Sequence, residues 1–188
     1  MHITKILSFI VTMTLLLFSC IKDDESETIN YINVNSQIPT FAVEDTAGNT
    51  FSSKQFIGKQ SLLVFFGTYC PDCKQVLPVI EEVWKELKDD PRFLLVTISR
   101  KETAEVVSNY WKENQFTMPF YLDTRGEVFS LFANNTIPRI YIINPDNEVV
   151  WMAVESLDIF SKRTNSKDQG FEIKQGTPSF FHNNPYRT

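Results

Sequence analysis

Short apolar runs alternate along this chain with segments in which apolar residues recur at helical spacing. Residues 61–66 and 92–99 are nearly continuous apolar runs, a pattern typical of strands covered on both faces of a sheet. From Pro71 onward apolar residues recur every three or four positions, with charged residues between them. This spacing predicts an amphipathic helix. A second helix is predicted over residues 102–115, with Ser99 and Glu102 at capping-box spacing before it.

Shorter patterns complete the predicted order of elements. Phe41 and Val43 alternate with polar residues, and Gly48-Asn49 gives a turn signal before Phe51, so an N-terminal hairpin is expected. The remaining expected elements are a short strand (119–123), a short helix (126–133) and two strands (139–144 and 148–154) joined by a turn at 145–147. Alternating strands and helices predict an α/β fold, with a central mixed sheet, helices on both faces and the N-terminal hairpin as an extension.

The first residues form a pattern of a different kind. Lys5 precedes an apolar core over residues 6–18, which is too short to span a bilayer comfortably and has the length of a signal-peptide core. It ends in "LFSC", which resembles a bacterial lipobox, although Phe18 is bulkier than the residue usual there. We therefore expect residues 1–19 to be a lipoprotein signal peptide and Cys20 to carry the lipid. The alternative is an ordinary cleaved signal with an incidental cysteine.

The residues after Cys20 suggest a cellular location and a division of the chain into tether, domain and tail. Residues 22–25 (KDDE) resemble the surface-export signal of lipoproteins in some Gram-negative bacteria, and they also suit a solvated tether. We expect a lipidated acidic tether over residues 20–36, a folded domain over 37–161 and a polar, poorly ordered tail over 162–188. The expected location is the outer membrane, facing the periplasm or the cell surface.

Composition narrows the class of protein. Hydrophobic residues make up 43 % of the chain, which is ample for the packed core of one domain. The formal net charge is −5 and no basic stripe is visible, so nucleic acid is not an expected partner.

Cys70 and Cys73 are the cysteines that remain after the predicted lipidation site. In an exported protein such thiols normally persist as disulfides or as redox centres. A zinc site needs about four ligands, and beyond this pair the mature chain offers only His182. Attachment of a c-type haem needs a histidine directly after the second cysteine, where Lys74 stands. We therefore expect no metal and no organic cofactor.

A structural staple and a redox centre remain as interpretations of the pair. A bond that closes such a short loop removes little chain entropy, so it would add little stability. Cys70 lies where the predicted strand gives way to the predicted helix, and the free N–H groups at a helix start favour a thiolate. Pro71 suits the first helical turn, and Cys73 follows one turn later. The position of the pair favours the redox interpretation.

With these residues in place, the chain resembles the thioredoxin superfamily, and within it the membrane-anchored TlpA/ResA-type thiol-disulfide oxidoreductases, including their AhpC/TSA-like region. The resemblance covers about residues 36–154 and rests mainly on "LLVFFGTYCPDCKQVLP" and "NTIPRIYIINPDNEVVW". It implies a thioredoxin-like fold in which Cys70 attacks a substrate disulfide and Cys73 resolves the product. It also implies a cis peptide bond before Pro138, a substrate-binding backbone at Ile137 and a docking role for Tyr69.

The chain departs from the family at three positions. Val64 stands where thioredoxins carry a buried acid, and Val76 where ResA-type proteins often carry Glu. Arg139 follows the expected cis-proline, where Thr is common. Asp72 would oppose thiolate formation, and Arg139 could offset that charge or point to solvent. The sequence therefore shows no proton acceptor for Cys73.

The resemblance implies a lipid-anchored enzyme that exchanges disulfides with exported proteins, acting as a reductase. Its expected partners are proteins with disulfide or dithiol groups and a membrane electron donor or acceptor. A peroxiredoxin-like peroxidase is one alternative, although that family needs Thr or Ser three residues before its cysteine, where Gly67 stands here. The other is a non-catalytic surface binding module with an inert cysteine pair.

Overall fold

A mixed sheet of seven strands runs through the part of the chain that the computed structural model describes, residues 27–155. In spatial order the strands are β2 (Thr50–Ser52), β1 (Ala42–Glu44), β5 (Tyr121–Asp123), β4 (Phe93–Arg100), β3 (Gln60–Phe66), β6 (Arg139–Ile143) and β7 (Val149–Val154). The three central strands β5, β4 and β3 are parallel, and the other neighbouring pairs are antiparallel. The hairpin β1–β2 extends the sheet beside β5, so the predicted mixed sheet and N-terminal hairpin are confirmed.

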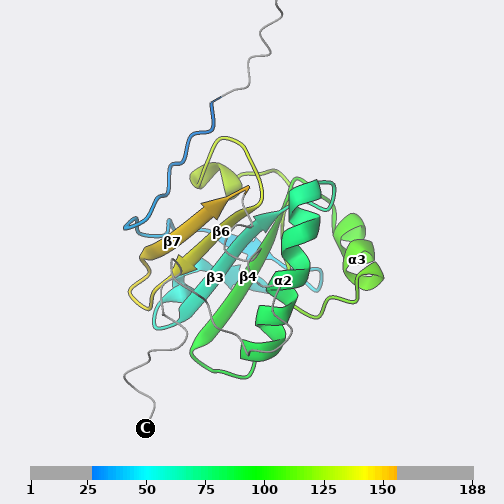
Figure 1. Cartoon of the computed structure of the whole chain (residues 1–188), viewed down its shortest axis with the longest axis horizontal. Helices are drawn as coiled ribbons and strands as arrows, with labels where there is room; N and C mark the ends of the chain where they lie inside the picture. Colours follow the sequence, from blue (N-terminus) through cyan, green and yellow to red (C-terminus); the bar gives the residue numbers. More distant parts are fainter. Residues whose placement is uncertain (1–26, 156–188) are drawn as a thin grey trace, which may run out of the picture.

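Helices cover both faces of this sheet, but they are of different kinds. The α-helices α2 (Pro71–Leu87) and α3 (Ala104–Glu113) pack into one hydrophobic cluster, and α2 crosses in front of β3 and β4 (Figure 1). The other face is covered in part by two 3₁₀ helices, η1 (Ser53–Phe56) and η2 (Phe129–Leu131). The α/β fold with helices on both faces is therefore confirmed.

The alternation of side chains along β3 explains the two clusters. Val64 and Phe66 point into the cluster under α2, while Leu63 and Phe65 point into the opposite one, as the period of a strand requires. The opposite cluster is rich in aromatic rings, and Phe65 lies 5.5 Å from Phe129 between ring centroids in an edge-on arrangement. A strand buried on both sides therefore leads straight into the segment that carries the cysteines.

The predicted capping box before the second helix is wrong. Ser99 still belongs to β4 and is paired with Phe66 and Leu122 in the sheet, so it is not available as a cap. Helix α3 starts at Ala104, and the side chain of Thr103 accepts the cap hydrogen bond from a backbone N–H. The short helix expected over 126–133 is also reduced, to the 3₁₀ turn η2.

The predicted boundary between tether and domain at residue 37 lies too late in the chain. The backbone N–H groups of Tyr31 and Ile32 donate to the Phe132 carbonyl at 2.9 and 3.2 Å. Asn35 N–H donates to the Val149 carbonyl at 2.8 Å. Because these bonds tie residues 30–36 to the sheet and to the loop before β6, this stretch belongs to the domain. The predicted signal peptide 1–19, the lipidation site Cys20 and the tail 162–188 lie outside the described residues.

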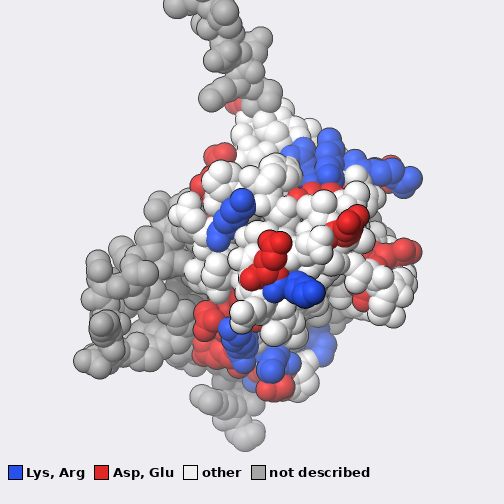
Figure 2. Space-filling model, turned by 90° about the vertical axis from the view of Figure 1, so that its right-hand side faces the viewer, with Lys and Arg blue, Asp and Glu red and all other residues white. Residues whose placement is uncertain are grey.

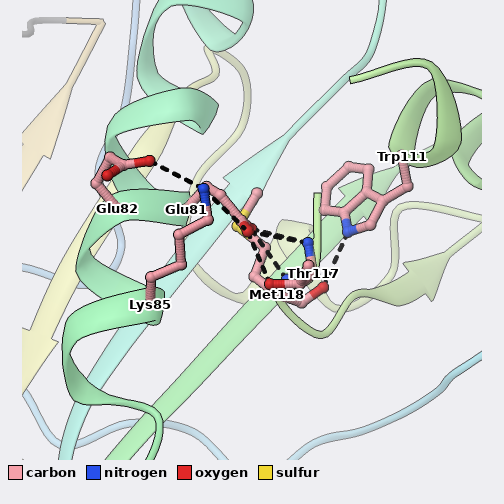
Figure 3. A network of polar contacts seen from close by, with 6 residues as sticks. All are labelled: Glu81, Glu82, Lys85, Trp111, Thr117 and Met118. Carbon is pink, nitrogen blue, oxygen red and sulfur yellow. Dashed lines mark hydrogen bonds and ion pairs between the residues drawn. The ribbon is translucent and has the colours of Figure 1, made fainter. Parts of the chain in front are cut away.

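A buried carboxylate on α2 fixes the loop that leads from α3 to β5 (Figure 3). Glu81 is 3 % exposed and accepts hydrogen bonds from Thr117 N–H, Thr117 Oγ1 and Met118 N–H. The Met118 carbonyl in turn accepts from Trp111 Nε1 at 2.9 Å. The network joins both α-helices to one loop.

Replacing Glu81 with Gln should lower the free energy of unfolding by about 1–3 kcal/mol, because the amide keeps only one of the two acceptor oxygens and at least one buried donor of Thr117 or Met118 loses its acceptor. The matched control is Glu82→Gln, since Glu82 is exposed and forms a surface ion pair with Lys85 at 3.0 Å. A surface pair of this kind contributes about 0–1 kcal/mol. Urea unfolding followed by circular dichroism measures both. Equal losses in the two variants would contradict a structural role for Glu81.

The surface on the α3 side carries both signs of charge (Figure 2). Basic side chains gather toward the top of this view with acidic side chains beside them, and both kinds are scattered over the rest of the face.

Within residues 27–155 no helix has the length and apolar character needed to cross a bilayer.

Candidate active site

Cys70 lies at the junction between β3 and α2 and is the N-cap residue of the helix. Its Sγ accepts a hydrogen bond from Cys73 N–H at 3.3 Å, one of the N–H groups that a helix start leaves free. Pro71 occupies the first turn, as expected. Both cysteines are free thiols in this structure. The geometry can therefore stabilise negative charge on the Cys70 sulfur.

Cys73 lies one turn further along α2 and is completely buried. Burial raises the pKa of the Cys73 thiol strongly, and hydrogen bonding to Cys70 raises it further. The charge of Asp72 acts in the same direction. Val64 and Val76 are fully buried in the same cluster as the two cysteines, so apolar groups surround the Cys73 thiol. Cys73 is thus held as a protonated thiol.

The loop before β6 reaches the cysteines from the other side. The peptide bond between Ile137 and Pro138 is cis, as predicted. The Cys70 thiol donates to the Ile137 carbonyl, with 3.5 Å between Sγ and oxygen. The backbone of Ile137 therefore lies directly beside the sulfur of Cys70.

Tyr69 and Ile137 together cover Gly67, the last residue before the turn that leads to the cysteines. Tyr69 is 60 % exposed, so much of its ring is accessible to a partner. A Cβ atom at Gly67 would lie 2.7 Å from Tyr69 Cε1, closer than such atoms approach, and 3.0 Å from Ile137 Cδ1, which is a tight contact. A Thr or Ser at position 67 would therefore require the exposed Tyr69 ring to shift.

Comparison with known proteins agrees with this geometry. The Redoxin family model matches residues 33–166. The chain belongs to the Redoxin family. ResA, a thiol-disulfide oxidoreductase of Bacillus subtilis, is 30 % identical over 119 residues, which span 63 % of this chain and 66 % of ResA. This supports the predicted placement among the ResA/TlpA-type proteins of the thioredoxin superfamily.

Two solved structures show the same fold as this redoxin. A candidate protein disulfide isomerase from Bacteroides thetaiotaomicron superposes with a TM-score of 0.63 at 27 % identity, over 66 % of this chain and 80 % of that one. StoA from Bacillus subtilis gives a TM-score of 0.54 at 26 % identity, over 62 % and 88 % of the two chains. The thioredoxin-like fold is confirmed, and the enzyme class is that of a thioredoxin-like disulfide oxidoreductase.

The charged residues singled out in the sequence lie in different surroundings. Asp72 is exposed in the first turn of α2. Arg139 is completely buried and lies on the opposite face of the sheet from the cysteines, with its guanidinium carbon 5.9 Å from the centre of the Phe129 ring. Neither expectation for Arg139 holds, because it points neither to solvent nor toward Asp72. Its guanidinium instead binds the loop before Ile137.

Glu102 is a residue of this redoxin that the sequence pattern misassigned. Its carboxylate is 9 % exposed and accepts hydrogen bonds from Thr68 N–H at 3.0 Å, from Thr68 Oγ1 and from Ser99 Oγ at 2.7 Å. It therefore fixes the backbone just before Tyr69 and Cys70. The available signal was an acidic residue two positions after a buried strand, which the capping-box pattern explained differently.

No cluster of three or more His, Cys, Asp or Glu side chains suitable for a metal ion occurs within residues 27–155.

Proposed function

We propose that this redoxin is a lipid-anchored reductase of disulfides in exported proteins, with Cys70 as the attacking and Cys73 as the resolving cysteine. The observation that supports it best is the position of the Cys70 sulfur. It receives an N–H from the start of α2 and contacts the Ile137 carbonyl beside cis-Pro138. The candidate nucleophile thus lies in direct contact with the backbone that the family resemblance assigns to substrate binding.

The exchange proceeds in two steps. The Cys70 thiolate attacks one sulfur of a substrate disulfide, and the other substrate sulfur leaves as a thiolate that takes a proton from solvent. Cys73 then loses its proton and attacks the Cys70 sulfur of the mixed disulfide, which releases the second substrate thiol. The substrate gains two electrons and the enzyme keeps a Cys70–Cys73 disulfide. A dithiol donor must return those two electrons before the next turnover.

The second step should depend steeply on pH. Because the pKa of Cys73 is raised and its neighbours Val64 and Val76 are apolar, the thiolate fraction at Cys73 grows about tenfold per pH unit. We expect the rate of substrate release from a preformed mixed disulfide to rise by about that factor per unit between pH 7 and 9. Stopped-flow measurement of single turnovers tests this. A rate that levels off below pH 8 would show that another group accepts the Cys73 proton.

The direction of electron flow can be tested by the reduction potential of the cysteine pair. A value near −270 mV, typical of thioredoxin, would support a reductase, whereas a value near −120 mV is typical of a strong oxidant. Redox equilibration with glutathione and dithiothreitol buffers, read by mass spectrometry after alkylation, gives the potential. A value near −120 mV would overturn the proposed direction while leaving disulfide exchange intact.

The location belongs to the same proposal. The ResA-type similarity, the lipobox-like "LFSC" and the acidic residues after it support an extracytoplasmic, membrane-associated protein anchored through Cys20. Placement in the outer membrane rests on residues 20–25 alone. Metabolic labelling with palmitate, compared between the wild-type chain and Cys20→Ala and followed by membrane fractionation, tests both parts. Equal labelling of the two proteins would overturn the anchor.

A further inference from the structure

Arg139 is a buried cation that donates hydrogen bonds to the loop before Ile137 and to the N-terminal segment. Its Nε donates to the Thr136 carbonyl at 2.9 Å and its Nη2 to the Asn135 carbonyl at 3.0 Å. Its Nη1 donates to Asn30 Oδ1 at 2.6 Å. Burying a guanidinium costs free energy unless its N–H groups have acceptors. Here Nε, Nη1 and Nη2 each donate to an acceptor, which is one of two consecutive backbone carbonyls or the Asn30 side-chain amide.

The loop that Arg139 binds has a backbone conformation that needs support. Thr136 has φ +70°, in a region that β-branched residues rarely adopt. The next residue is Ile137, whose carbonyl accepts from the Cys70 thiol. The bonds from Arg139 to the residue 135 and 136 carbonyls therefore hold the chain just before the atom that touches the reactive sulfur.

The N-terminal segment, residues 27–31, holds the same loop from its other side. Ile29 N–H donates to Asn134 Oδ1 at 2.8 Å, and Asn134 N–H donates to the Ile29 carbonyl at 3.3 Å. Asn30 forms a β-bridge with Ala133. The loop is thus held between Arg139 and a stretch of chain that the sequence had assigned to a tether.

We propose that Arg139 and Asn30 form a clamp that positions the Ile137 carbonyl for pairing with the substrate strand. Arg139 is a positioning residue, because it acts through the loop and touches neither cysteine. The inference rests on the proposed function and adds to it that the segment leading out of the predicted anchor is part of the substrate-binding apparatus.

The clamp should matter for extended peptide substrates and not for small disulfides. A peptide must align with the Ile137 backbone before its disulfide meets Cys70, whereas a small aromatic disulfide needs only access to the sulfur. Loosening the clamp should therefore raise KM for a peptide disulfide and lower kcat/KM by about tenfold. The rate with 5,5′-dithiobis(2-nitrobenzoic acid) should stay within about twofold of the wild-type rate.

The test uses the full chain in detergent and four variants: Arg139→Gln, Arg139→Lys, Asn30→Ala and the control Arg92→Gln. Arg139→Lys keeps the positive charge but loses the planar guanidinium and its several N–H donors. If the role of Arg139 is geometric, kcat/KM for the peptide should therefore fall in Arg139→Lys as much as in Arg139→Gln. Asn30→Ala should lower kcat/KM for the peptide by about threefold. If the Arg139 variants do not fold, Asn30→Ala alone tests the clamp. Arg92 is exposed and pairs with Asp90, so Arg92→Gln should match the wild type.

Three results would overturn the clamp: full activity of Asn30→Ala and the Arg139 variants toward the peptide, an equal loss toward peptide and small disulfide, or full activity of Arg139→Lys alone. The last would show that charge and not position is what matters. If the wild-type chain reduces neither substrate, the proposed function itself fails, which the variants alone could not show.

Discussion

Cys70→Ser should abolish the reduction of insulin disulfides, with a loss on the order of 10³-fold or more. The Cys70 sulfur accepts the Cys73 N–H at the start of α2 and contacts the Ile137 carbonyl. A serine hydroxyl at neutral pH is a very poor nucleophile toward a disulfide. Cys73 cannot replace it, because it is completely buried and its pKa is raised. Turbidity of the precipitating insulin B chain, with dithiothreitol as donor, measures the rate.

Serine differs from cysteine by one atom, so Cys70→Ser should keep the wild-type melting temperature, and thermal unfolding serves as the control. A Cys70→Ser protein that remains folded and reduces insulin at the wild-type rate would contradict the assignment of the attacking cysteine. Comparable losses in Cys70→Ser and in the exposed control Ser130→Ala would point to damage unrelated to the site.

Glu102→Ala should lower the free energy of unfolding by about 3 kcal/mol, because it strands the Thr68 N–H, the Thr68 hydroxyl and the Ser99 hydroxyl in a buried region. The same change frees the backbone one residue before Tyr69, so kcat/KM for insulin should fall by about tenfold in the protein that remains folded. Urea unfolding and the insulin assay at low temperature give the two quantities separately.

Glu105→Ala is the matched control. Glu105 lies in the first turn of α3 and is exposed, so its removal should cost only about 0.3–1 kcal/mol of helix-dipole interaction and leave activity unchanged. Glu102→Gln keeps one acceptor oxygen, so its free energy of unfolding and its kcat/KM for insulin should lie between those of the wild type and of Glu102→Ala. An activity of Glu102→Ala equal to that of Glu105→Ala would show that Glu102 supports stability alone.

The sequence predicted the architecture well because local patterns determine it. The run at 61–66 gave β3 to within one residue, and the helical spacing after Pro71 gave α2. The cysteine pair could be placed at the helix start because strand, turn and helix are consecutive in the chain. These features are determined by residues close to one another in the sequence, so the pattern of apolar and polar residues is enough to predict them.

The misassigned residues depend on contacts between distant parts of the chain. Glu102 looked like a cap, but its carboxylate binds Thr68 from another strand–helix junction. Arg139 follows cis-Pro138 in sequence, yet strand alternation turns its side chain to the far face, where it meets Asn30. The start of the domain was placed too late because residues 30–36 carry no strong pattern and are held by backbone bonds to residues 132 and 149.

The central claim is that Cys70 forms a covalent mixed disulfide with a substrate and that Cys73 resolves it. The most direct measurement is mass spectrometry, under non-reducing conditions, of the full-chain Cys73→Ser protein after incubation with a disulfide-bonded peptide. We predict an adduct of one peptide half that maps to Cys70, is released by dithiothreitol and is missing in the Cys70→Ser/Cys73→Ser double variant. Failure of Cys73→Ser to form the adduct, or an equal adduct in the double variant, would contradict this account.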